Sequence, residues 1–357
     1  MKTTLYFTDF YFTALAASAF LLTSPAFAAD APSPVALNAS FNPTEQASRM
    51  FTVALPEVLK GVKRVAVPLF TIDFTTADSE SAETSGFAAA GRARVASFYK
   101  LKGVGQVEFQ ALTDAAYARF LADLQAAGFE VLGIDKVQQS PTYRKLVASG
   151  KPMPAVRSDG MLLAPAGMGS YGFSKAGGAK PTLLGGLSAM GSAFSDMSTM
   201  MSSALDTVEL GKELDAAVIE VQLRVNFVQL TNENKGFLGR LAGTASVSSK
   251  VYPSITGATY SVHSITRGSL TLKQPLALDA SVFSEVRKAP ATTTATTADV
   301  AGAIAVGLLQ LAIGSKSSSS SSEQMEAVAD PARYREVVGG GLTVLNQMFV
   351  QRLRAGE

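Results

Sequence analysis

The chain has 357 residues, of which 47% are hydrophobic and 17% charged, with a formal net charge of +2, no Cys and one His. The lack of Cys excludes disulfide frameworks, thiolate zinc sites, iron–sulfur clusters and Cys nucleophiles, and a single His excludes a multi-histidine metal site. Because nucleic-acid binding needs several phosphates neutralised at once, a near-neutral chain without a basic run indicates no nucleic-acid partner. We expect a globular, export-compatible protein with no cofactor and few groups suited to catalysis.

The N-terminus has the pattern of an export signal. Residues 10–22 are uncharged and mostly apolar, and the small residues Ala26 and Ala28 precede a cleavage point before Ala29, which predicts a signal peptide over 1–28. The apolar run of 13 residues is too short for a membrane span, which needs about 20. We expect a periplasmic or secreted protein of a Gram-negative bacterium, with association with the outer membrane left open. The alternative interpretation of the run is a buried N-terminal helix.

The first part of the mature chain is predicted to be a flexible lead-in over 29–43, which is rich in Pro, Ser and Asn, followed by an α+β core domain over 44–285. Residues 62–70 have the apolar pattern of a buried strand. Residues 77–86 are small, acidic and without a period, which predicts a loop, and residues 91–101 show a weaker strand pattern.

A helix and a short strand are predicted next. Apolar residues recur at helical spacing over 109–127, and Gly128 supplies the C-terminal cap before a strand over 129–134. The helix–Gly–strand join is typical of layered α/β structure. The residues on the apolar face of this helix are Phe109, Leu112, Ala116, Phe120 and Leu124.

The strongest helical pattern lies over 183–208. Its stripe has two interpretations, a helix that covers the sheet, with Met side chains filling gaps, or an interface with a second copy or another protein. The candidate interface residues are Leu187, Met190, Phe194, Met197, Met201 and Leu205.

Three half-buried strands are predicted to follow. Residues 217–230 alternate strictly between apolar and polar side chains, which indicates one buried and one wet face. Residues 244–263 alternate more loosely, and 268–279 contains Pro275, which favours an edge position. Three such strands in succession favour an antiparallel meander. The fold class is therefore α+β, with a mixed, largely antiparallel sheet and packing helices.

The C-terminal part is predicted to be low-complexity linkers over 286–330, which enclose an apolar segment over 300–314. That segment could cover the core, insert into a partner or lie at a membrane surface. Asp330 and Pro331 then begin a C-terminal amphipathic helix over 331–357, in which three successive glycines indicate a kink or a close helix contact. Its apolar face comprises Tyr334, Val338, Leu342, Leu345, Phe349 and Leu353.

Three motifs resemble catalytic or cofactor sites, and each has a simpler interpretation. Residues 167–172 match G-x-G-x-x-G, but no acidic residue follows at the spacing that a dinucleotide site needs, so a Gly-rich loop is favoured. Ser97 and Lys100 match S-x-x-K without its companion motifs, which indicates a chance match. His263 lacks a nucleophile elbow and is interpreted as a strand histidine on a polar face.

Four carboxylates at Asp73, Asp78, Glu80 and Glu83 could act in pairs, as in glycoside hydrolysis. They lie in a stretch expected to be solvated, and they lack the spacing of a calcium loop. A cell-wall-active hydrolase is therefore kept as an alternative function.

Several segments together resemble a known family. The strand motif K-R-V-A-V-P-L-F over 63–70, the helix over 109–127, the motif G-F-E-V-L over 128–132 and the strand over 215–221 are similar to the CsgG-like periplasmic domain of curli-secretion channels, which shares the architecture of the TolB N-terminal domain. The resemblance covers about half of the mature chain. It implies binding and assembly rather than catalysis. Channel members of the family insert strand hairpins in the outer membrane, and residues 217–279 alternate suitably; many members are lipoproteins, whereas this chain has no Cys to lipidate.

We therefore expect an exported, non-enzymatic scaffold or binding protein of the cell envelope that acts through protein–protein contacts. The expected partners are envelope proteins and further copies of the chain. An outer-membrane pore or secretion component is the first alternative, and the cell-wall-active hydrolase is the second.

Overall fold

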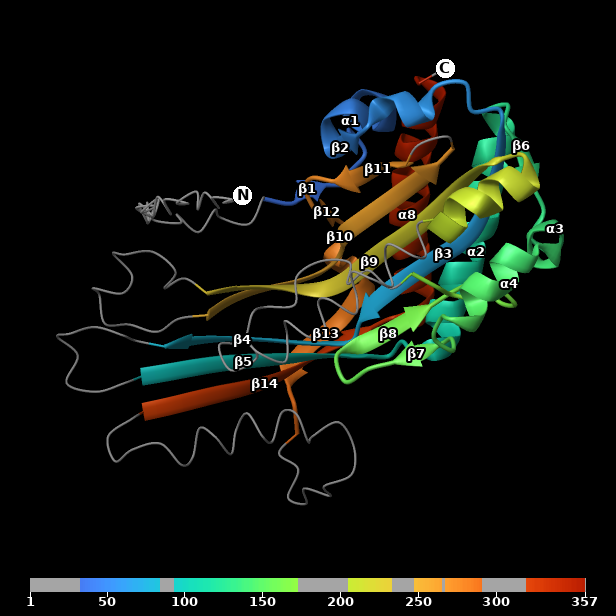
Figure 1. The fold of residues 1–357 in the computed structure, drawn as a ribbon. Helices are drawn as coiled ribbons and strands as arrows, with labels where there is room; N and C mark the ends of the chain where they lie inside the picture. Colours follow the sequence, from blue (N-terminus) through green and yellow to red (C-terminus); the bar gives the residue numbers. More distant parts are fainter. Residues whose placement is uncertain are drawn as a thin grey trace, which may run out of the picture. The chain divides into compact units, whose positions relative to one another are not determined.

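A computed structural model of the chain describes residues 33–83, 93–172, 205–232, 247–264, 267–290 and 319–356, all of which belong to one unit, Pro32–Glu357. This part of the chain is an α+β structure with a mixed, largely antiparallel sheet, packing helices and a long C-terminal helix (Figure 1), which confirms the predicted fold class.

The described helices are α1 Pro43–Met50, η1 Pro56–Leu59, α2 Gln106–Ala126, α3 Ile134–Gln139, α4 Pro141–Ala148, η3 Ala280–Val282 and α8 Pro331–Arg354, and residues 205–214 are also helical. The described strands are β1 Val35–Ala36, β2 Phe51–Ala54, β3 Arg64–Thr75, β4 Ala77–Glu83, β5 Ala93–Lys102, β6 Glu130–Leu132, β7 Ala155–Val156, β8 Gly160–Leu163, β9 Ala217–Asn232, β10 Val247–His263, β11 Arg267–Leu272, β12 Leu276–Ala277, β13 Phe283–Lys288 and β14 Ser319–Ala329.

The larger sheet is built around two long parallel strands, β3 and β9. Its strand order is β1-β12-β10-β9-β3-β8-β7, with β11 between β10 and β2, and with β6 paired to β3. The strands β9, β10 and β11 are successive antiparallel neighbours, which confirms the predicted meander. The third strand predicted over 268–279 is divided into β11 and β12. Pro275 lies between the two strands, and it has no N–H to give to a strand ladder.

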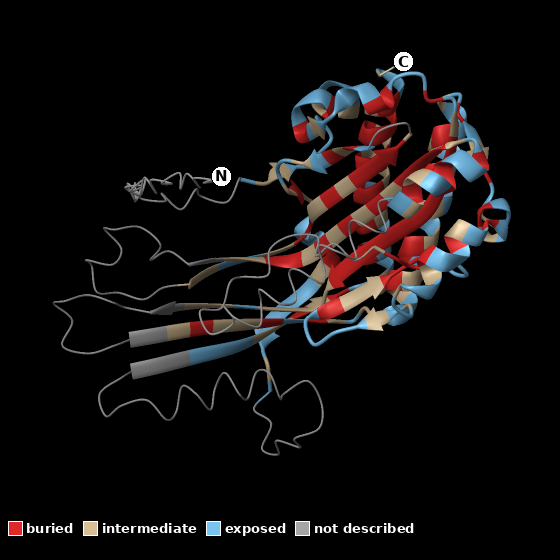
Figure 2. Cartoon of the chain, viewed as in Figure 1, coloured by how far each residue is buried: buried red, intermediate tan, exposed pale blue. Residues whose placement is uncertain are grey.

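The helices α2 and α8 pack side by side on one face of this sheet. Aromatic rings join the layers: Tyr260 of β10 stacks on Phe349 of α8 with ring centroids 4.1 Å apart, and Phe74 of β3 stacks on Phe109 of α2 at 4.4 Å. Figure 2 shows that burial is concentrated in these layers. The predicted stripes of both helices are buried, namely Phe109, Leu112, Ala116, Phe120 and Leu124 on α2, and Tyr334, Val338, Leu342, Leu345, Phe349 and Leu353 on α8.

A smaller core lies on the opposite face, under α3, α4 and the helical segment 205–214. The two faces follow from the strand period, because Val65 and Val67 of β3 join the α2–α8 core whereas Ala66 between them joins the smaller one. The alternation of β9 is as predicted, but part of the β9 face predicted to be solvent-exposed lies under α3, α4 and the helical segment 205–214.

The helix α8 begins as predicted. The Asp330 side chain accepts a hydrogen bond from the backbone N–H of Arg333 at 2.7 Å, and Pro331 follows in the first turn. The helix runs without interruption through its three glycines. One of them marks a close contact, because a Cβ at Gly341 would lie 2.7 Å from Cδ2 of Leu278.

Three segments predicted to be irregular contain strands. The expected lead-in over 29–43 contributes β1, the expected loop over 77–86 contributes β4, and the expected linker over 286–330 includes the end of β13 and all of β14. Small polar side chains give no strand pattern of their own, and β4 and β14 are strands because both pair along their length with β5.

The signal peptide predicted over 1–28, the stripe over 183–204 and the apolar segment over 300–314 lie outside the described residues. Among the helices that are described, none combines the length and the apolar character needed to cross a membrane.

Candidate functional site

Three pairs of successive antiparallel strands project toward the same end of the molecule. The outgoing strands are β9, which runs parallel to β3, β4, which continues the line of β3 after Thr76, and β13. The returning strands are β10, β5 and β14, and β14 runs parallel to β5. In all three pairs, the end of the outgoing strand and the start of the returning strand therefore lie at the same end, where Figure 1 shows the strands extending beyond the helices. We call β4, β5, β13, β14 and residues 226–232 and 247–254 of β9 and β10 the projecting strands.

Four of the projecting strands form a second sheet with the order β13-β14-β5-β4. This sheet is anchored at its base, where Tyr99, Leu101 and Ala327 are buried, and it is joined to β10 by a hydrogen bond of 2.6 Å between the hydroxyls of Tyr99 and Ser249. β13 is largely exposed, as Figure 2 shows, and Val286 keeps 43% of its surface accessible. Within the described residues, no strand pairs with the outer edge of β13.

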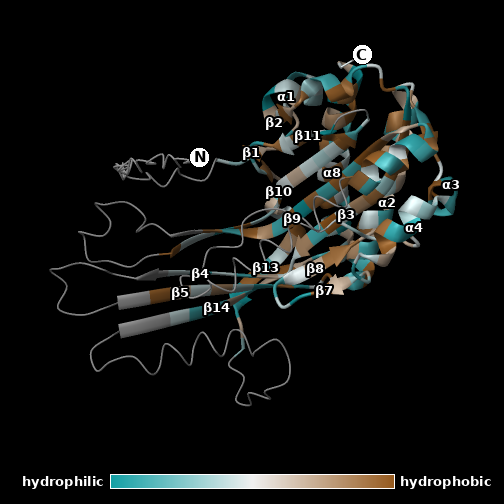
Figure 3. Cartoon of the chain, in the orientation of Figure 1, coloured by the Kyte–Doolittle hydropathy of each residue, from teal (hydrophilic) through white to brown (hydrophobic). Residues whose placement is uncertain are grey.

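Ion pairs between the strands give this sheet its charge pattern. Arg287 of β13 pairs with Glu326 of β14 at 3.3 Å, and Lys288 pairs with Glu323 at 2.8 Å. Lys102 of β5 reaches Glu326 from the other side at 3.6 Å. Figure 3 shows the resulting polar character of β13 and β14 against the apolar strands of the core. The Lys288–Glu323 pair is exposed on both sides and contributes little stability, so its main effect is to define which charges a partner strand meets.

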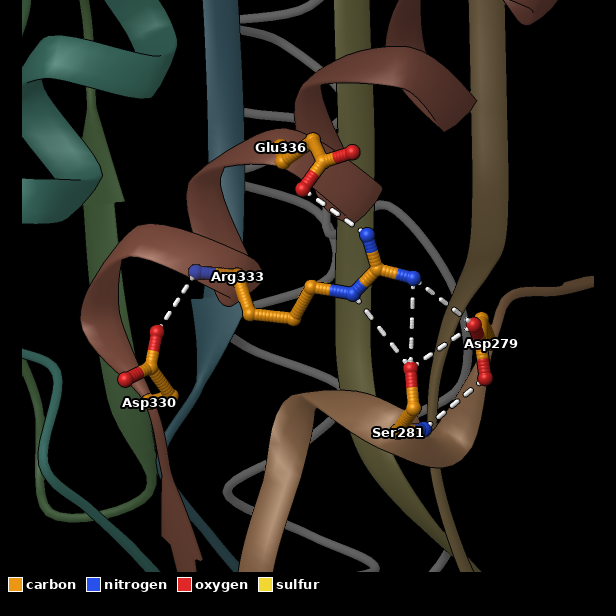
Figure 4. A network of polar contacts seen from close by, with 5 residues as sticks. All are labelled: Asp279, Ser281, Asp330, Arg333 and Glu336. Carbon is orange, nitrogen blue, oxygen red and sulfur yellow. Dashed lines mark hydrogen bonds and ion pairs between the residues drawn. The ribbon is translucent and has the colours of Figure 1, made fainter.

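A polar network at the base of the β13–β14 hairpin ties it to α8 (Figure 4). The Arg333 guanidinium donates to the Ser281 hydroxyl and the Asp279 carboxylate, at 3.3 and 3.1 Å, and pairs with Glu336 at 2.8 Å. Hydrogen bonds from the backbone and hydroxyl of Ser281, and then the charge of Arg333, hold the pKa of Asp279 below its ordinary value. Asp279 and Ser281 precede β13, and Asp330 follows β14, so both ends of the hairpin are fixed at this network.

The sequence does not predict the Arg333 network. Its central contact, between Arg333 and Asp279, joins residues 54 positions apart, and its members carry no motif. The one available signal was the helix N-cap at Asp330, which predicts the start of α8 but not what its first turn contacts.

Of the carboxylates considered for hydrolysis, Asp73 is not part of an exposed cluster. Asp73 is buried on β3, where Arg157 donates to one carboxylate oxygen and Arg224 of β9 donates to the other at 3.0 Å. The stretch around it was expected to be solvated, and this expectation is wrong for Asp73. Asp78 and Glu80 lie on β4, and the side chain of Glu83 lies outside the described residues. The structure thus gives Asp73 the role of an ion-pair centre.

His263 was expected on a polar strand face, and this expectation is wrong, since its side chain is fully buried. Its Nε2 lies 3.0 Å from Oε2 of Glu220 on β9, and Oε1 of Glu220 accepts from the Thr207 hydroxyl at 3.1 Å. Burial alone would raise the pKa of Glu220, but the hydrogen bond and charge of His263 and the Thr207 hydroxyl outweigh it and lower the pKa. The cluster joins β9, β10 and the helical segment 205–214.

The other motifs also have defined places. Ser97 and Lys100 lie on the strand β5, where residues three apart point to opposite faces, so they lack the helical arrangement of the S-x-x-K enzymes. Residues 167–172 form a loop against α4, with Gly167 and Gly172 at positive φ. The residues that follow Gly172 lie outside the described part of the chain.

Of the candidate interface residues, only Leu205 is described; it lies at the start of the helical segment 205–214 and is 70% exposed. The candidates Leu187, Met190, Phe194, Met197 and Met201 lie outside the described residues. In the described part of the chain, no three His, Asp or Glu side chains gather closely enough to hold a metal ion.

Comparisons with protein-family models, with curated proteins and with solved structures return no match for this chain. The functional argument therefore depends on the described geometry.

Proposed function

We propose that the protein is an exported, non-enzymatic scaffold of the cell envelope that assembles through its projecting strands, with further copies of the chain as the first partners. The observation that carries this proposal is the convergence of three strand pairs at one end, with the outer edge of β13 exposed. An edge strand offers a row of backbone donors and acceptors that a strand of another chain can pair with.

The contacts of the buried polar side chains support the same proposal. The groups that the sequence offered for chemistry are engaged in structural contacts: Asp73 with two arginines, and His263 with Glu220 in a closed interior. The network around Arg333 holds the base of the hairpin on the core. A sheet fixed at its base and exposed along β13 is suited to recognition by strand addition.

A second candidate is a secretion component or pore of the outer membrane. It is favoured by the same three strand pairs, because their common direction would let the projecting ends of these strands in several copies reach a membrane together. Fractionation of the natively expressed, C-terminally tagged protein separates the two. Recovery in the soluble periplasm or medium supports the scaffold, whereas recovery only with detergent supports the membrane component.

The substitution Val286→Asp tests the assembly surface. A carboxylate in the middle of the exposed edge strand adds a charge that a pairing strand must desolvate, so we expect about tenfold weaker self-association by size-exclusion chromatography with light scattering. The matched control is Val107→Asp, which places the same charge at an equally apolar position, 78% exposed, in the first turn of α2. A Val286→Asp protein that assembles like the wild type, or a control that loses assembly equally, contradicts the proposal.

A further inference from the structure

A cleft of about 780 Å³ lies between α4 and the Gly-rich loop 167–172, and none of its described lining residues belongs to the projecting strands. Its size is within the range of small-ligand and peptide sites. The Gly-rich motif over 167–172 forms one of its walls, and no described residue of the proposed assembly surface lines it.

The walls of the cleft are held in place by specific contacts. The backbone N–H of Gly169 donates to the Tyr143 hydroxyl at 3.2 Å, and Gln138 donates to the carbonyl of Gly167 at 2.9 Å. A Cβ at Gly169 would lie 2.4 Å from Val147, so glycine is needed for the loop to approach α4. Ser140 caps the start of α4, and its hydroxyl donates a hydrogen bond of 2.5 Å to the carboxylate of Glu213, which holds the start of the helix in place. The cleft is therefore preformed.

The described residues of the lining carry one sign of charge. Arg144 and Lys151 line the cleft, together with apolar side chains that include Val147, Met153 and Met168, and none of the described lining residues is an Asp or Glu. Among the described residues, the Arg144 guanidinium donates to a single acceptor, the backbone carbonyl of Gln139, at 3.3 Å, and it is exposed. Its other N–H groups point to no carboxylate among the described residues. An arginine in this state can still form a bidentate pair with an incoming carboxylate.

We propose that this cleft binds the carboxyl terminus of a peptide whose last side chain is apolar. The carboxylate would pair with Arg144, and the side chain would lie on the apolar floor formed by Val147, Met153 and Met168. A free inorganic anion would leave that floor uncovered, and an apolar chain without a charge would leave the guanidinium without a partner. The proposal is independent of the assembly through β13.

The test uses the full mature chain and two fluorescent peptides that end in Ala-Ala-Phe, one with a free carboxylate and one with a carboxamide. We expect the carboxylate peptide to bind with a Kd below about 1 mM, and the carboxamide to bind at least about tenfold more weakly, by fluorescence anisotropy. Equal binding of the two peptides, or no binding of either at that concentration, overturns the proposal.

Substitution then places the peptide in this cleft. Arg144→Gln should weaken binding of the carboxylate peptide about tenfold and leave the carboxamide unaffected. The matched control is Arg335→Gln, because Arg335 on α8 is also exposed and also donates to a single backbone carbonyl, that of Pro331 at 3.4 Å. Unchanged binding by Arg144→Gln, or an equal loss in both variants, overturns the proposal. Thermal unfolding of both variants checks that the fold is intact, and assembly through β13 is read separately by light scattering.

Discussion

The largely buried carboxylate of Glu220 joins three separate segments of the chain. It receives hydrogen bonds from His263 on β10 and from Thr207 on the helical segment 205–214, and the side chain of the buried Tyr171 lies close to it. A buried charge is tolerated only when it is paired and hydrogen-bonded, and Glu220 meets this condition with both oxygens. Glu220 therefore links the helical segment 205–214 to β9 and β10.

The substitution Glu220→Gln should lower the free energy of unfolding at pH 7 by about 1 to 3 kcal/mol, because the amide can accept only one of the two hydrogen bonds and carries no charge toward His263. The pKa of Glu220 is lower in the folded chain than its ordinary value of 4.5. Its contribution is therefore fully present above pH 4.5 and is lost as the pH falls through the folded pKa. The wild type and variant should thus converge in acid.

Urea unfolding of both proteins from pH 7 into acid measures this convergence. The groups that face Glu220 are His263, Thr207 and Tyr171, and Arg267 adds a favourable charge. The matched control is Glu209→Gln on the same helical segment, where the side chain is half-exposed and only a Lys212 contact is lost. If the difference in free energy of unfolding between the wild type and Glu220→Gln stayed constant with pH, the charge of Glu220 would make no contribution to stability.

At the scale of the element, α8 contains two neighbouring glycines with opposite surroundings. A Cβ at Gly340 would meet nothing within 4 Å, whereas a Cβ at Gly341 would lie 2.7 Å from Leu278. Both lie in a helix, where glycine costs about 1 kcal/mol relative to alanine. The helix thus accepts one glycine for a close contact, while the other has no contact to explain it.

Gly340→Ala should raise the free energy of unfolding by about 0.5 to 1 kcal/mol, because it restores helix propensity without a clash. Gly341→Ala should lower it by about 1 to 3 kcal/mol, because Leu278 must move away from a packed position. Each variant is the control for the other, and chemical unfolding measures both. Stabilisation by both substitutions would mean that Leu278 can move away from an added Cβ at position 341 without loss of stability.

The sequence predicts the elements whose pattern lies in their own side chains. The stripes of α2, α8 and β9 are of this kind, because burial on one face requires apolar residues at the period of the element. β4 and β14 have small polar residues and become strands through pairing with β5, which no local pattern encodes. The pairs Glu220–His263 and Asp73–Arg224 were missed for a related reason: they depend on the register between strands, and the alternation predicts faces but not register.

At the scale of the whole molecule, the core is closed by segments from opposite ends of the chain. The helix α8 packs on α1, and Gln351 donates to the Thr44 hydroxyl across 307 residues of sequence. In the interior of the fold, Phe349 stacks on Tyr260, whose hydroxyl donates to the buried Asn346 at 2.6 Å. The sheet face that α2 and α8 cover is therefore complete only when α8 has docked. We expect folding of this core to depend on contacts between residues far apart in the sequence.

Removal of the last helix should consequently abolish cooperative unfolding. A chain that ends at Ala329 leaves Tyr260 and the α2 stripe exposed, so we expect loss of near-ultraviolet circular dichroism and binding of a hydrophobic dye. The milder variant Phe349→Ala should fold but lose about 3 to 5 kcal/mol of the free energy of unfolding, since it leaves a cavity against Tyr260. A control chain that ends at Arg354, where the helix is already complete, should unfold like the wild type. Cooperative unfolding of the chain that ends at Ala329, at the wild-type midpoint, would show that the sheet and α2 form a core without α8.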